Sequence, residues 1–250
     1  MSWRKLRICL FALLGCFGAV WVCAQQPVAT NAEPKKGKWE SEVALGLTLT
    51  SGNRETWLLT GDARTQRKKP PTEWSFGLNA SYGETEDVKS TELLRGYGQA
   101  NRLWGEYWFL YARGDGLHND ITGVDYRFAV GPGLGRYLLK RSRTSLSVEA
   151  GATFVWERVS SAANDYVAVR FAERFEHKFN DRARVWHSVE WLPAVDDWSD
   201  YVLTAEAGVD SALSKLLSMR VYVQDIYDSE PALGRKPNDL RLVSALVVKF

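Results

Sequence analysis

Apolar side chains occupy every second position along most of the chain between Trp39 and Phe250. In the first such run, Val43, Leu45 and Leu47 share one face, and small or polar residues share the other. Further alternating runs, many of about 10 to 14 residues, continue to the end of the chain. No segment with helical periodicity competes with them. The pattern predicts an all-β chain of about twelve strands.

Alternation alone does not say which face meets water, because a soluble sandwich or barrel has the same period with its apolar face inward. The runs are long enough for tilted strands to cross a bilayer, and Trp and Tyr gather near their ends, as an interfacial girdle requires. The polar face combines Gly and Ser with charges of both signs, which suits a narrow hydrated lumen. We therefore expect a transmembrane antiparallel up-and-down β-barrel over residues 39–250, with a soluble periplasmic β-protein as the alternative.

Some details of the strands follow from the same pattern. One run sets Val124, Tyr126 and Phe128 on the apolar face. In the glycine-containing runs around residues 90–117, the pattern does not decide which set of alternate residues faces outward. An even strand number with the N-terminus in the periplasm returns the C-terminus there. The connection at residues 51–53 is then extracellular, and the next one, at residues 68–72, is periplasmic.

The first 24 residues have a separate character. Arg4, Lys5 and Arg7 precede an apolar run that closes at Val22-Cys23-Ala24, the pattern of a secretory signal peptide cleaved after Ala24. An uncleaved anchor and a lipoprotein signal at Cys16 are the alternatives. Residues 25–38 are polar and aperiodic, which predicts a flexible periplasmic leader. All three cysteines lie inside the signal segment, so the exported chain would contain no disulfide.

The overall composition argues against two classes of protein. A mean hydropathy of −0.28 with 25% charged residues is too polar for a bundle of transmembrane helices. A formal charge of +2 does not indicate a surface that binds nucleic acid. Removal of the three basic residues of the signal segment changes the formal charge to −1. Strands with one apolar and one wet face fit these averages.

Charged residues on the polar face of the runs are the strongest candidates for a functional site. We expect them to project into the barrel as a mixed-charge network that either fills the lumen or leaves a narrow path. The predicted lumen network consists of Glu42, Asp62, Arg64, Arg127, Glu149, Arg170, Arg174, Glu190, Glu206, Arg220 and Arg241.

Other chemistry receives less support from the sequence. The histidines are His118, His177 and His187. The adjacent His187 and Ser188 point to opposite faces of a strand and cannot form a catalytic dyad. We therefore expect no catalytic residues and interpret the histidines as interfacial or loop residues. No metal-ligand spacing and no cofactor motif is present, and the acidic residues at 196–200 and 84–87 are interpreted as solvated loop charge. The glycines of residues 131–135 are better explained by close backbone approach or sheet curvature than by phosphate binding.

Several motifs resemble a known family. They are Ser51-Gly52-Asn53 after Gly46, the glycine-rich segment at residues 131–137, the segment at residues 225–232, and the terminal Val248-Lys249-Phe250. Together they resemble the salt-induced outer membrane protein family, a family of unknown function, over about residues 39–250. The resemblance implies an outer-membrane β-barrel, and it brings no catalytic residues with it.

The leading functional hypothesis is a non-enzymatic barrel of the bacterial outer membrane with a narrow or occluded lumen and a role in envelope integrity or stress. A narrow channel for ions or small solutes is the first alternative, and an outer-membrane lipid hydrolase is the second. The expected partners are outer-membrane lipid, lipopolysaccharide and the barrel-assembly machinery, but no nucleic acid. The C-terminal assembly signal is Leu246, Val248 and Phe250.

Overall fold

A computed structural model describes residues 37–50, 55–231 and 234–250. The signal segment, residues 25–36 of the leader and the turn at residues 51–53 lie outside these described residues. The strands are β1 (Trp39–Thr50), β2 (Thr56–Lys69), β3 (Thr72–Thr85), β4 (Val88–Trp104), β5 (Trp108–Asn119), β6 (Val124–Lys140), β7 (Thr144–Val159), β8 (Ala162–Lys178), β9 (Ala183–Pro193), β10 (Tyr201–Ala212), β11 (Leu217–Asp228) and β12 (Asn238–Lys249).

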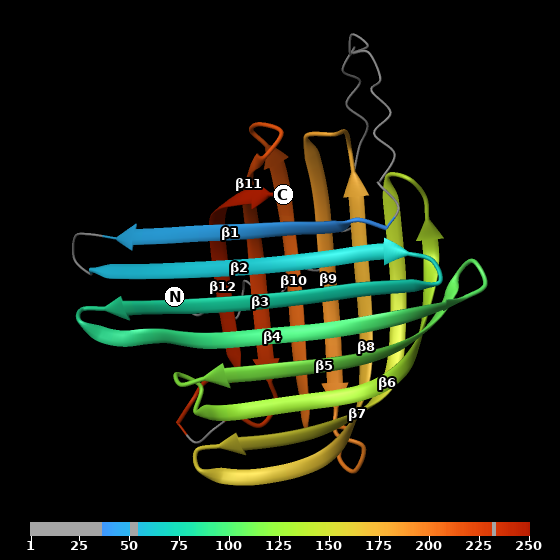
Figure 1. Ribbon diagram of the computed structural model, residues 1–250. Helices are drawn as coiled ribbons and strands as arrows, with labels where there is room; N and C mark the ends of the chain where they lie inside the picture. The colour runs from blue at the N-terminus through green and yellow to red at the C-terminus, as the bar shows by residue number, and fades with distance from the viewer. Residues whose placement is uncertain (1–36, 51–54, 232–233) are drawn as a thin grey trace, which may run out of the picture. The chain divides into compact units, whose positions relative to one another are not determined.

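The twelve strands form one closed antiparallel barrel in which each strand pairs with its sequence neighbours. Figure 1 shows the strands following one another around the wall, with β1–β5 crossing in front of β9–β12. Strand β1 closes the ring by pairing with β12, where Glu42 is opposite Lys249. Closure satisfies the edges that an open sheet would expose, as a barrel in lipid requires. The predicted transmembrane up-and-down barrel is confirmed.

The outer surface is mainly apolar between two aromatic bands. An even-stranded outer-membrane barrel has both ends in the periplasm, which defines an extracellular and a periplasmic end for every strand. Aromatic side chains are exposed near both ends, as an interfacial girdle requires. The extracellular band includes Trp57, Tyr82, Phe128, Trp156 and Trp198, and the periplasmic band includes Trp39, Trp74, Trp104, Trp108 and Phe179.

Irregular pairing changes one expectation from the sequence. Val124 was expected on the apolar face with Tyr126 and Phe128, but this expectation is wrong, because Val124 is buried and faces the lumen. The register between β6 and β7 shifts between Val124 and Tyr126, and such a bulge reverses the face of the residue beyond it. In β4 and β5, where the sequence left the faces open, residues such as Gln99 and Arg113 are buried, and their neighbours face outward.

Among the residues that the structure describes, no helix is long and apolar enough to cross a membrane.

Candidate functional site in the barrel lumen

One cluster of buried charges lies between β9, β10, β11 and β1. Arg220 is only 1% exposed and donates to both carboxylate oxygens of Asp210, with Nε–Oδ1 and Nη2–Oδ2 distances of 2.9 Å each. Its Nη2 also donates to Glu42 Oε1 at 2.6 Å. Arg184 binds Asp210 Oδ2 at 2.7 Å from the other side. Two arginines and two carboxylates therefore neutralise each other within this cluster.

A second cluster is centred on Arg170 of β8. Its Nη1 donates to Glu149 Oε2 at 2.8 Å, and its Nε donates to Glu190 Oε2 at 2.8 Å. Gln99 donates to Glu149 Oε1 at 3.1 Å and accepts from Arg113 Nη1 at 3.1 Å. The second cluster thus joins residues of β4, β5, β7, β8 and β9 into one network.

Ion pairs also cross the lumen between walls that are far apart around the ring. Arg95 of β4 and Arg113 of β5 approach Glu190 of β9 at 3.7 Å and 3.9 Å. Arg127 of β6 approaches Asp228 of β11 at 3.5 Å. A further pair joins β2 to β10, where Arg64 lies 4.0 Å from Glu206. Because three or four strands lie between these partners around the ring, their side chains obstruct the central path.

Aromatic rings inside the barrel lie directly over glycines of the wall. A Cβ atom on Gly133 would come within 2.3 Å of the Tyr111 ring, and one on Gly135 would come within 2.2 Å of the Phe109 ring. Gly208 makes room in the same way for Trp186 and Tyr222. These glycines of the polar face therefore allow large side chains to fill a lumen that would otherwise be too narrow for them.

A small cavity remains in the extracellular half of the lumen. It is lined by charged residues including Arg95, Arg127 and Glu190, and by an apolar wall that includes Leu192 and Ile226. Its volume of about 120 Å³ is below the roughly 300–1,000 Å³ of typical small-molecule sites. Arg170 lines this cavity, and its Nη2 atom is buried without a hydrogen-bond partner among the described residues. The cavity has room for water or a small ion.

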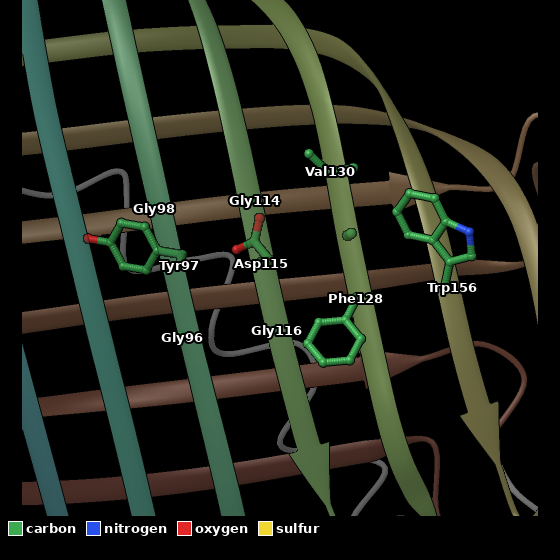
Figure 2. A pocket seen from close by; sticks show the side chains of 10 residues that line it. Gly96, Tyr97, Gly98, Gly114, Asp115, Gly116, Phe128, Val130 and Trp156 are labelled. Carbon is green, nitrogen blue, oxygen red and sulfur yellow. The ribbon is translucent and has the colours of Figure 1, made fainter.

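A second hollow lies on the lipid-facing side of the wall. Figure 2 shows its glycine floor on β4 and β5, at Gly96, Gly98, Gly114 and Gly116, beside the rings of Phe128 and Trp156. Because this depression is open and mostly apolar, it is suited to lipid chains rather than to polar solutes.

The eleven predicted lumen residues all lie on inward faces of their strands. Most of them join the clusters and crossings above, and Arg174, Asp62 and Arg241 make further contacts. Arg174 approaches Glu149 at 3.4 Å, Asp62 accepts from Asn79 at 2.9 Å, and Arg241 donates to Gln224, which in turn donates to Glu206.

Sequence reasoning missed several members of the network. They alternate with outward-facing residues in the same way as the predicted ones, so the alternation of each strand contained the information. These members are Arg95, Gln99, Arg113, Asp115, Glu157, Arg184, Asp210 and Asp228. Arg95 and Arg113 lie in the two strands whose faces the sequence left open. Asp210 and Glu157 alternate with apolar residues and were identifiable from the pattern alone.

The histidines do not form a catalytic arrangement within the described residues. His187 faces the lipid beside Phe175, with ring centroids 5.2 Å apart, whereas Ser188 is opposite the lumen residues Arg174 and Glu206. His187 therefore differs from the expected interfacial or loop position, because it lies in the middle of β9. His118 Nδ1 contacts the Asp125 carbonyl oxygen at 2.7 Å near the extracellular end of β5. No group of three or more potential metal ligands occurs in residues 37–50, 55–231 and 234–250.

The C-terminal strand presents its predicted signal on the outer surface. Leu246 and Val248 of β12, and Phe250 directly after it, are all exposed on the outer surface. The backbone of Phe250 exchanges two hydrogen bonds with Ser41, so the last residue takes part in closing the barrel.

Comparison with known proteins places the chain in a family. The family described as "Protein of unknown function, DUF481" matches residues 43–250. The chain belongs to the DUF481 family. This assignment confirms the resemblance to an outer-membrane family of unknown function.

Two further comparisons concern a relative and a solved structure. The uncharacterized protein YdiY of Escherichia coli (strain K12) is 23% identical over 221 residues, which cover 87% of this chain and 86% of YdiY. An outer-membrane channel from Pseudomonas putida F1 has a TM-score of 0.51 at 11% identity, covering 90% of this chain and 100% of the channel. The likeness to the channel extends to the fold, and this DUF481 member is an outer-membrane β-barrel.

Proposed function

We propose that this DUF481 protein is a non-enzymatic barrel of the outer membrane whose lumen is closed by its own ion pairs, and that it serves envelope integrity under stress such as high salt. The approach of Arg95 and Arg113 to Glu190 from the opposite wall carries the proposal. An open pore would leave the lumen centre to water, whereas here charged side chains from distant strands meet there.

The energetics of these contacts support a closed resting state. Glu190 also accepts from Arg170 Nε at 2.8 Å, and Arg170 is 3% exposed. Removing one partner of a buried pair of this kind costs about 3–5 kcal/mol. The bond from Arg170 therefore favours the position in which Glu190 lies within reach of Arg95 and Arg113.

Conductance in planar bilayers tests the proposal. The wild-type protein is expected to give no reproducible unitary conductance, whereas Glu190→Ala, which releases three arginines from their shared carboxylate, is expected to give measurable conductance. Glu176→Ala is the matched control, because Glu176 contacts only Lys178 and Arg184 among the ion pairs of the described residues. A regular wild-type conductance that changes on neutralisation of Arg127 or Arg220 would contradict the closed lumen.

A narrow channel for ions or small solutes is the second candidate. The cavity in the extracellular half favours it, because its charged lining extends inward as far as Arg170 and Glu190. Such a channel would show ion selectivity that changes with Arg170→Ala even if its conductance is small.

A lipid hydrolase is the weakest candidate, because His187 has no serine on its own face at neighbouring positions of β9. Purified protein is expected to release no fatty acid from phospholipid vesicles. Release that is lost on substitution of a histidine would instead establish an enzyme.

The route to the membrane belongs to the same proposal. The signal peptide directs export and is cleaved after Ala24, so mass spectrometry of protein from outer membranes should find Gln25 as the first residue. The barrel-assembly machinery recognises the C-terminal strand, and lipopolysaccharide surrounds the extracellular end. Phe250→Ala is expected to lower the yield of heat-modifiable barrel in outer membranes, whereas Lys249→Ala is the control on the opposite face.

A further inference from the structure

A pair of ionisable side chains faces the lipid on the outer wall of β8 and β9. His187 Nε2 lies 3.6 Å from Glu173 Oε1, and the two side chains are 40% and 43% exposed. Within the described residues, neither side chain makes a hydrogen bond. Each side chain therefore has polar atoms that no described residue satisfies.

The depth of this pair makes its exposure costly. Phe179 of the periplasmic band bonds through its backbone to Ala183, and Trp191 lies opposite Phe171 toward the extracellular end. His187 is midway along the chain between Ala183 and Trp191, so it lies near the centre of the apolar zone. An ionisable side chain facing lipid at the bilayer midplane is strongly unfavourable, and the penalty falls toward the interfaces.

Outward charges elsewhere on the barrel have a different setting. Arg136 lies 5.0 Å from the ring of Trp108 at the periplasmic band, and Arg158 lies 5.6 Å from the ring of Tyr126 at the extracellular end. Long side chains at these depths reach the headgroup region. Glu173 and His187 differ from these arginines, because their side chains lie at the centre of the apolar zone, where no lipid headgroup is within reach.

We infer that this face of β8, β9 and β10 is the contact surface for a second copy of the same chain in the outer membrane. Two copies inserted in the same direction are related by a two-fold axis along the membrane normal, so equivalent depths face each other. Glu173 lies five residues above Lys178, and His187 lies four residues above Ala183, so the two have similar depth. Glu173 of each copy then faces His187 of the other.

The surface around the pair is suited to close approach. Ala207 is opposite His187 on β10, and Ala205 is opposite Val189, so on the β10 side the outer wall beside the pair carries only the methyl groups of these alanines. Small residues let backbones approach closely inside a membrane, where packing and polar contacts drive association. Charge complementarity selects a second copy as the occupant, because a Glu–His pair is complementary to itself under two-fold symmetry.

The oligomeric state in lipid tests this inference. Full-length protein purified from outer membranes and reconstituted in nanodiscs at low protein density should contain two chains per particle by mass measurement. Glu173→Leu and His187→Leu should each weaken dimerisation by about tenfold or more, and the double exchange Glu173→His with His187→Glu should restore it. Leu242→Met, on the outer face of β12, is the matched control and should leave the dimer unchanged.

The variants separate loss of contact from loss of fold. Replacing lipid-facing charges by leucine favours the folded monomer in lipid, so heat-modifiable gel migration should be retained in both single variants. Cross-linking of Ala207→Cys with a long bifunctional thiol reagent in intact membranes should give a dimer, with the wild-type chain treated identically as the control for Cys9, Cys16 and Cys23. A monomeric wild type, a dimer unaffected by both leucine variants, or cross-linking only to another protein would overturn the inference.

Discussion

Arg220 and Asp210 are directly paired across β10 and β11, and their side chains form a bidentate salt bridge inside the barrel. Among the described residues, Arg220 is the largest of the fully buried side chains, and Asp210 is 2% exposed. The alternation that turns apolar residues toward lipid also turns these charges inward, where they need each other. The lumen of the protein is thus stabilised by polar contacts and the outer wall by lipid.

Asp210→Asn should lower the free energy of unfolding by about 3 kcal/mol, because an amide cannot neutralise the guanidinium groups of Arg220 and Arg184. Urea unfolding followed by tryptophan fluorescence in lipid vesicles measures the change. Asp181→Asn, in an exposed periplasmic turn, is the control and should change stability little. In a double-mutant cycle, Asp210→Asn and Arg220→Gln should be non-additive, and additive effects would contradict a shared interaction.

Gly133→Ala should cost about 1–3 kcal/mol, because the new methyl group overlaps the ring of Tyr111. Tyr111 cannot move aside easily, since its hydroxyl also lies over Gly151 and accepts from Arg170 Nη1 at 3.2 Å. The same unfolding assay applies. Gly114→Ala is the matched control, because the nearest atom to its Cβ lies 4.0 Å away. Equal costs at the two positions would show that ring packing does not explain the inward glycine.

The sequence predicted the strands and their outward faces well because alternation is a local property of each strand. Val124 was placed wrongly because its orientation depends on a register shift against β7, which single-strand periodicity does not contain. Likewise, the alternation in β6 predicted that Arg127 faces inward, but it could not predict that Arg127 pairs with Asp228. Which distant walls meet depends on the stagger and closure of all twelve strands.

Lys89→Met should raise the pKa of Asp120 in the extracellular turn after β5. The hydrogen bond from Lys89 Nζ to Asp120 Oδ2, at 2.8 Å, and then the lysine charge hold the pKa of Asp120 below its ordinary value. Because the folded pKa is lowered, this contact stabilises the turn above the ordinary pKa and is lost as the pH falls through the lowered value. Carboxyl NMR titration of the protein in nanodiscs measures it, with Lys215→Met as the control. An unchanged pKa of Asp120 in Lys89→Met would contradict the pairing.

Leu45→Arg should destabilise the barrel by about 2–4 kcal/mol, the cost of an arginine facing lipid near the bilayer midplane. Leu45 lies at the middle of β1 and is 61% exposed on the outer wall, where a soluble protein would accept arginine readily. Leu45→Met should cost less than about 1.5 kcal/mol because it keeps volume and apolarity, and the lumen change Thr48→Ser should also cost little. Unfolding in vesicles measures all three. If Leu45→Arg were tolerated as well as Leu45→Met, the outer wall would face water, and the transmembrane orientation would be wrong.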